Sequence, residues 1–174
     1  MKSAKIMQTL YRIIKIIDFI SEYSGKLISF IVLPLTIFVA YDVFVRYIFD
    51  APTNWVYEMT WMQNGSLFIL GGAYVTLKKS HIRVDILYKK YSEKTKKFFD
   101  IVVYLLIFVP VFYIMMKHSY FYAFESISYL EHSMISYWQP PLYPIKSILF
   151  IGLTIFFLSG VSDLLKIFFS FDRQ

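Results

Sequence analysis

Cysteine is absent from the 174 residues of this chain. Its absence excludes disulfide bonds, zinc–thiolate sites, iron–sulfur clusters and a cysteine nucleophile. The sequence also has no glycine-rich phosphate-binding loop and no pair of histidines at the spacing of metal ligands. We therefore expect a chain that is not an enzyme and that holds no cofactor or metal of its own.

Charged residues are also scarce, at 17% of the chain, whereas a soluble domain averages about 25%. Hydrophobic residues make up 57% and aromatic residues 21%. A water-soluble monomer of this length cannot bury so much apolar surface, and a disordered chain has low hydrophobicity. The composition thus indicates a membrane protein, and we expect residues 1–174 to form a single membrane domain.

Four mostly apolar stretches are long enough to cross the hydrocarbon core as helices. They lie at about 27–45, 59–77, 98–116 and 142–165. The third has no polar face between Val102 and Met116, unlike a helix of a soluble bundle, and it can continue to Phe124. A tyrosine-rich connection, 117–141, then leads to prolines that suit the start of the last helix. We predict an all-α integral membrane protein with four transmembrane helices.

Basic residues show how the chain is oriented. Fifteen of the 18 lysines and arginines lie before the first span, between the second and third, or after the fourth. By the positive-inside rule, both termini and the basic 78–97 loop are cytoplasmic. This topology accounts for the net charge of +6, so we expect no nucleic-acid partner.

The N-terminal segment, 1–26, is amphipathic. Charges interrupt its apolar residues and no small-residue cleavage site follows, so it is not a signal peptide. One helical face carries Lys5, Gln8, Thr9, Arg12, Lys15 and Glu22, and another carries Ile6, Leu10, Ile13, Ile14 and Ile17. We expect a helix that lies on membrane lipid at the cytoplasmic interface; the same pattern also fits a cytoplasmic extension of the first span.

Ionisable residues gather around the first turn. Asp42 and Arg46 are four residues apart and can pair on one helix. Glu58 opens the second helix, where the helix dipole favours a carboxylate, and Thr53 or Asn54 can supply the N-cap. The cluster either meets another subunit or satisfies itself locally, and the sequence leaves both open. The small residues at 71–73 likewise allow close helix packing, within this chain or against another.

Two other functional classes also fit a small membrane protein. One is a membrane anchor of a respiratory complex with a haem or quinone site. A bis-histidine haem would need two facing imidazoles, and His118 and His132 are the pair that could approach on one side. A self-contained carrier needs carboxylates nearer the membrane midplane than Asp42 and Glu58.

Residues 46–58 read RYIFDAPTNWVYE: an arginine, an aromatic stretch, a proline and then Trp-x-x-Glu. A helix rich in small residues follows, and HIRVD, at 81–85, comes directly after it. Trp138, Pro141 and Pro144 precede the last helix. In this order and spacing the sequence resembles the small membrane subunit of tripartite ATP-independent periplasmic (TRAP) transporters. Asp50 departs from the family, which often has asparagine there, and adds a carboxylate near Arg46.

The resemblance implies a multi-pass small permease subunit in a bacterial inner membrane. In that family a much larger elevator-type permease subunit carries the solute and sodium sites, and a periplasmic binding protein delivers the solute. The typical solutes are acidic, such as sialic acid, C4-dicarboxylates or keto acids. This chain is then expected to be a scaffold in a heterodimer with the large subunit, with sodium bound by that partner.

Three sets of residues are candidates for contacts with partners. The expected interface with the large subunit comprises Asp42, Arg46, Trp55, Glu58 and Trp61. The expected docking face for the binding protein comprises Asp50, Glu125 and Glu131. A cytoplasmic interface is expected at His81, Arg83 and Asp85.

Overall fold

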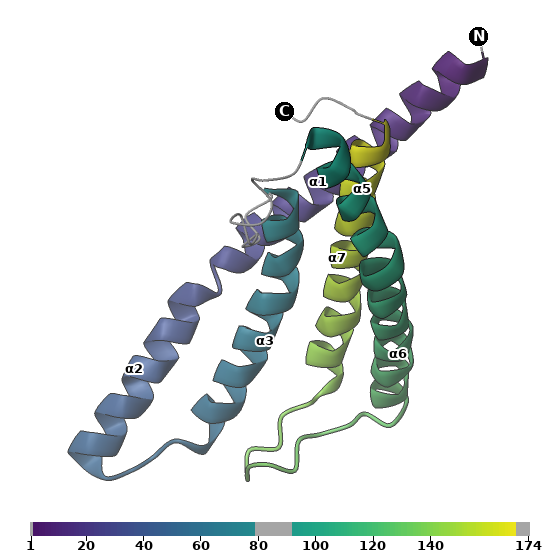
Figure 1. The fold of residues 1–174 in the computed structure, drawn as a ribbon. Coiled ribbons are helices and arrows are strands. Elements are labelled where there is room, and N and C mark those ends of the chain that lie inside the picture. The colour runs from purple at the N-terminus through teal and green to yellow at the C-terminus, as the bar shows by residue number, and fades with distance from the viewer. Residues whose placement is uncertain (1, 79–91, 170–174) are drawn as a thin grey trace.

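The computed structural model describes residues 2–78 and 92–169, and helices make up most of them (Figure 1). In chain order these are α1 (Lys2–Ser29), α2 (Val32–Phe49), α3 (Asn54–Leu77), α5 (Glu93–Val103), the π-helical segment η1 (Tyr104–Phe108), α6 (Val109–Ser128) and α7 (Tyr143–Phe169). The described residues contain no strand, only an isolated bridge between His132 and Pro141. The prediction of an all-α chain is confirmed.

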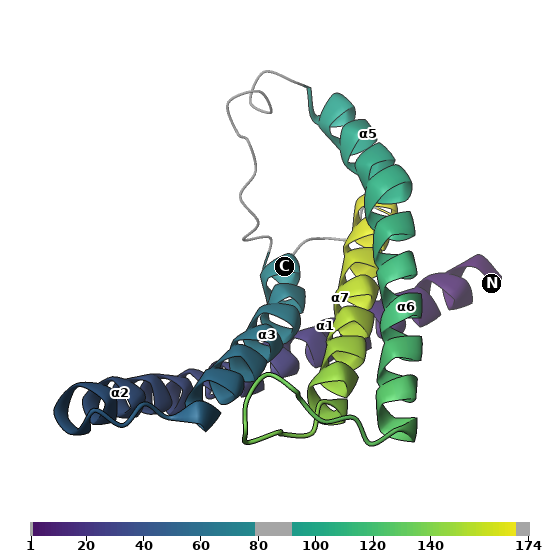
Figure 2. The same cartoon turned by 90° about the horizontal axis from the view of Figure 1, so that it is seen from below.

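The central helix of the arrangement is α7. It packs between α3 and α6 and also contacts α1 (Figures 1 and 2). In both views α1 and α2 follow one oblique line, and α1 crosses α3 and α7. α2 packs against α3 and contains no buried residue, so its sides are free for lipid or for another protein.

Three helical stretches among the described residues are long and apolar enough to cross a membrane: Lys5–Phe49, Lys94–Ser128 and Tyr143–Phe169. They contain three of the four predicted spans. The second predicted span, 59–77, is helical within α3 but is not among the three, because Gln63, Asn64 and Ser66 lower its hydropathy. Its crossing, and the orientation of the termini, stay predictions.

Several helices extend beyond the predicted spans, whose own limits stay predictions. α1 continues past residue 26 to Ser29, and α2 covers Val32–Phe49 rather than 27–45. Residues 93–97, expected in the 78–97 loop, belong to α5. The helix before the last connection continues past the predicted span to Ser128, in agreement with the expectation that it can reach Phe124. The reason is that hydropathy marks only the part of a helix inside the hydrocarbon, whereas helices extend beyond it with polar residues at their ends.

Proline explains both irregularities in the long helices. Pro34 has no N–H, and the Phe30 carbonyl accepts from Leu33 N at 3.2 Å where α1 gives way to α2. In the helical stretch formed by α5, η1 and α6, Pro110 follows the wide turn of η1. In that turn the Val109 N–H donates to the Tyr104 carbonyl. This wider turn makes room for the proline ring against the preceding turn. The predicted amphipathic segment is therefore a separate helix that continues the line of the first span.

Small residues set the spacing of the helices. A Cβ atom on Gly72 would lie 2.7 Å from the Phe156 ring, and one on Gly160 would lie 2.1 Å from the Phe108 ring. Ser159 Oγ donates to the Ala73 carbonyl at 3.2 Å, which joins α7 to α3. Much of this small-residue stretch of α3 thus packs within the chain, although a Cβ on Gly65 or Gly71 would meet nothing within 4 Å.

The face of α1 that packs on the bundle is narrow and combines apolar, small and polar residues. Its buried residues are Ile14, Ser21 and Gly25, whereas the isoleucines at 6, 13 and 16 are exposed. Asp18 lies on this face, accepting from Ser162 Oγ at 3.0 Å and from Lys166 Nζ at 2.7 Å. Polar contacts therefore fix α1 to α7, and its aliphatic side remains available to lipid.

Gly25 gives a test of this close packing. A Cβ there would lie 2.4 Å from Tyr74 Cβ, an atom too near the backbone to move aside. Gly25→Ala should therefore lower the free energy of unfolding by about 1–3 kcal/mol, as overpacking does. Gly71→Ala is the matched control, because its Cβ meets open space and alanine favours a helix by roughly 0.5–1 kcal/mol. Thermal unfolding of both variants in detergent measures the difference, and equal melting temperatures would contradict the packing.

Candidate functional site

The turn between α2 and α3 is held by one carboxylate. Asp42 Oδ2 accepts from Arg46 Nη2 at 2.5 Å, which confirms the predicted pair. Asp42 Oδ1 accepts from the Thr53 backbone N–H at 3.0 Å and from the Thr53 hydroxyl. Thr53 does precede α3, but its side chain makes no capping bond to that helix. It binds Asp42 instead. Of the two predicted N-cap residues, Thr53 does occupy the N-cap position, although its hydroxyl serves the turn and not the helix.

Aromatic packing holds the same turn from the membrane side. The Trp55 ring meets Phe38 edge-on, with centroids 5.3 Å apart, and lies 6.0 Å from the Tyr41 ring. Asp50 follows the last residue of α2 with φ 52°, a left-handed conformation that Asn, Asp and Gly adopt most readily. The aspartate at position 50 therefore suits the backbone that this turn requires.

Glu58 does not join the Asp42 cluster. It lies in the second turn of α3, since that helix begins at Asn54, so its predicted place at the helix start was wrong by about one turn. Its side chain is completely buried. The Ser136 hydroxyl donates to Glu58 Oε1, and Oε2 has no hydrogen-bond partner among the described residues. Glu58 therefore fixes the connection between α6 and α7 onto α3.

A second ion pair lies where that connection enters α7. Lys146 is buried in the first turn of α7, and its Nζ donates to Glu131 Oε2 and lies 3.7 Å from the centre of the Tyr122 ring. A cation is unfavourable at a helix N-terminus, so these two partners offset that cost. The hydrogen bond from Lys146 also holds the pKa of the Glu131 carboxyl below its ordinary value of 4.5.

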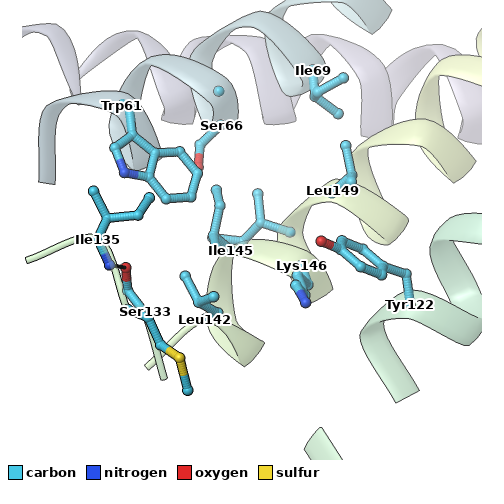
Figure 3. A pocket seen from close by; sticks show the side chains of 13 residues that line it. Trp61, Ser66, Ile69, Tyr122, Ser133, Ile135, Leu142, Ile145, Lys146 and Leu149 are labelled. Atoms are coloured by element: carbon cyan, nitrogen blue, oxygen red, sulfur yellow. Dashed lines mark hydrogen bonds between the residues drawn. The ribbon is translucent and has the colours of Figure 1, made fainter. Parts of the chain in front are cut away.

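Between these two anchors lies an apolar cavity of about 390 Å³ (Figure 3). Trp61 and Ile69 of α3 form one wall, and Ile145 and Leu149 of α7 form another. Tyr122 of α6 and Ile135 of the connection complete it. At its edge, Ser66 Oγ donates to the Met62 carbonyl and Lys146 Nζ donates to Glu131, so the cavity offers mainly shape and apolar contact.

The structure distributes the predicted residues unevenly. Asp42, Arg46 and Trp55 form one cluster, while Glu58 and Trp61 lie under or beside the connection to α7. Asp50 and Glu125 are exposed, but Glu131 is engaged by Lys146. The cytoplasmic candidates His81, Arg83 and Asp85 lie outside the described residues. The arrangement is thus suited to assembly, and these interface assignments stay predictions.

Several structurally important residues were not among the candidates. They are Asp18, Thr53, Tyr104, Ser136, Lys146 and Asp163. For Asp18, Lys146 and Asp163 the sequence did contain a usable indication. Each is a charged residue inside or beside an apolar run, and such a charge needs a partner. Ser136 gave no signal, since a serine in a loop is ordinary. No group of three or more His, Asp or Glu residues in 2–78 and 92–169 is placed to hold a metal ion.

Comparison with known proteins gives one family. The family described as "Tripartite ATP-independent periplasmic transporters, DctQ component" matches residues 35–169, from the first turn of α2 to the end of α7. No individual curated protein gave a match.

The contact between Ser136 and Glu58 can be tested by stability. Ser136→Ala leaves a buried carboxylate without its donor, and we expect it to lower the free energy of unfolding by about 1–3 kcal/mol. Ser128→Ala is the control: its hydroxyl is exposed and bonds only to its own helix, so its effect should stay within roughly 0.5 kcal/mol. Circular dichroism melts in detergent report both changes. Equal stabilities would show that Glu58 does not hold the connection.

Proposed function

The chain belongs to the DctQ-component family of tripartite ATP-independent periplasmic transporters, and on that premise we propose that it serves as the scaffold subunit of a sodium-coupled transporter for an acidic solute. The observation that carries the proposal is the family match, which includes every helix from α2 to α7. It assigns the chain to a transporter component and not to an enzyme. It also favours transport over a respiratory membrane anchor.

The proposed partner is the large permease subunit, which moves as an elevator and binds solute and sodium. An elevator needs a fixed wall in the bilayer, and a small subunit can enlarge that wall. Two features support this role. α2 has no buried residue, and an apolar groove of about 630 Å³ runs between α1, α3 and α7, lined by residues such as Phe19, Leu27 and Ile151. Such lateral surface can be covered by a partner's helices as well as by lipid.

We place the contact with the large subunit at the turn between α2 and α3. Asp42, Arg46 and Thr53 form a compact polar cluster there, and the Arg46 side chain remains about half exposed despite its ion pair. An exposed arginine beside Tyr47, whose exposed fraction is 82%, is the kind of group that anchors protein interfaces. Trp55 stiffens the turn by packing on α2.

The proposed topology places this end of the molecule in the periplasm and both termini in the cytoplasm of a bacterium, with the chain in the inner membrane. The periplasmic binding protein would then meet Asp50 and Glu125, which are exposed, and to a smaller extent Glu131, whose charge is balanced by Lys146. The solute is acidic, of the sialic acid, C4-dicarboxylate or keto acid type, and sodium is bound by the partner subunit. No nucleic acid takes part.

Assembly tests the scaffold role. Arg46→Ala should reduce the yield of a tagged complex with the large permease subunit roughly tenfold, as removal of an arginine hot spot does, and uptake should fall with it. Arg46→Lys keeps the charge and should retain more of both. Arg12→Ala, in α1 and outside the matched residues, is the control. A purified chain without a larger polytopic partner would refute the function, whereas a wild-type yield from Arg46→Ala would refute only this contact.

Docking of the binding protein is tested by salt. Glu125→Lys reverses an exposed charge near the end of α6, so uptake should fall at low ionic strength and recover as salt screens the repulsion. The measurement is solute uptake into proteoliposomes with added binding protein across a range of salt concentrations. Uptake equal to wild type at every concentration would remove Glu125 from the docking face.

A further inference from the structure

The ends of α7 show where the bilayer boundaries lie on this molecule. Asp163 accepts from Tyr104 Oη at 2.9 Å, and Lys166 pairs with Asp18, so charged groups gather at one level of the bundle. From there to Tyr143 the helix contains about 20 residues, or about 30 Å, which matches the thickness of the hydrocarbon core. The connection 129–142 therefore begins and ends at the opposite boundary, at the level of the lipid headgroups.

This connection is unusually apolar for a segment outside the hydrocarbon. No aspartate, glutamate, lysine or arginine occurs from 132 to 145. The exposed fractions are 95% for Met134, 68% for Ile135 and 97% for Tyr137. Trp138 is also exposed. Aliphatic residues beside tyrosine and tryptophan form the composition that is found where a protein meets the bilayer interface.

The connection is also held in one conformation. Ser133 N–H donates to the Pro140 carbonyl and Leu142 N–H donates to the Glu131 carbonyl, both at 2.8 Å. Ser133 and Ser136 hydroxyls accept from the N–H groups of Ile135 and Trp138. With Ser136 also bound to the buried Glu58, the apolar side chains are presented outward on a fixed loop, at less entropic cost than a flexible loop would incur.

We infer that Met134 and Tyr137, the two most exposed side chains of the connection, form a membrane-inserting tip, which enters the lipid interface at this end of the bundle and sets the depth of α6 and α7. The partner is the lipid surface. A docking surface for a soluble protein is favoured less, because the tip offers no charge to a partner and lies at headgroup level. The inference depends on the membrane location of the chain and on none of the details of solute, coupling or assembly.

The absence of cysteine makes the tip directly testable. A nitroxide label is placed at Met134→Cys in the full chain, which is reconstituted with its copurifying permease subunit in vesicles of phosphatidylethanolamine and phosphatidylglycerol. Lys94→Cys is the control, since Lys94 is exposed in the first turn of α5, outside the predicted span 98–116 and outside the residues proposed to contact partners. The unmutated chain, taken through the same labelling, reports any signal from the partner subunit.

We expect oxygen, which dissolves in lipid, to relax the label at 134 strongly, and an aqueous nickel chelate to reach it far less than the label at 94. Added binding protein should change neither result. Equal access of the chelate to both labels would overturn the inference. So would protection of position 134 from both reagents, or protection that appears only with the binding protein, because these would show a protein partner in place of lipid. A label at Tyr137→Cys repeats the measurement at a second exposed site.

Discussion

A charged side chain at the edge of the hydrocarbon is stable only when another segment pairs it, and α7 carries such groups at both ends. Lys146 is paired by Glu131 and Tyr122, Asp163 by Tyr104, and Lys166 by Asp18. Each of these partners comes from a different part of the chain. The pairing requirement of α7 therefore draws α1, the π-helical turn and the connection 129–142 to fixed places around one helix.

Close packing works together with this pairing. Between its charged ends α7 is apolar, and lipid is as good a solvent for its side chains as another helix is. Contact with α3 and α6 therefore depends on how well the surfaces fit. Glycines leave room for a facing side chain at three places: Gly72 for Phe156, Gly152 for Ile69 and Gly160 for Phe108. Polar pairs fix the register of the helices, and small residues then fix their distance.

The helices that pack least inside the molecule carry the proposed contacts with other molecules. α2 has no buried residue, and α1 buries only a narrow stripe that includes Ile14, Ser21 and Gly25. Since the hydrogen bonds of Asp42 and Glu58 are made within the chain, the turn and the connection have fixed shapes before any partner arrives. A rigid subunit with one tightly packed side and one open side is suited to act as a fixed wall for a larger transporter subunit.

The sequence by itself determined what depends on local composition and spacing: the all-helical class, the approximate positions of the apolar helices, the pairing of Asp42 with Arg46, and the resemblance to a transporter family that the comparison confirmed. Only the tertiary structure decided which distant groups meet. Thr53 binds Asp42 across a turn, Ser136 reaches Glu58 across 78 positions, and Asp18 reaches Lys166 across 148. Helix ends also lie beyond the predicted spans, because hydropathy indicates the part of a helix inside the hydrocarbon, whereas hydrogen bonding decides where the helix stops. A serine or an aspartate acquires its role from a partner distant in sequence, which local patterns do not reveal.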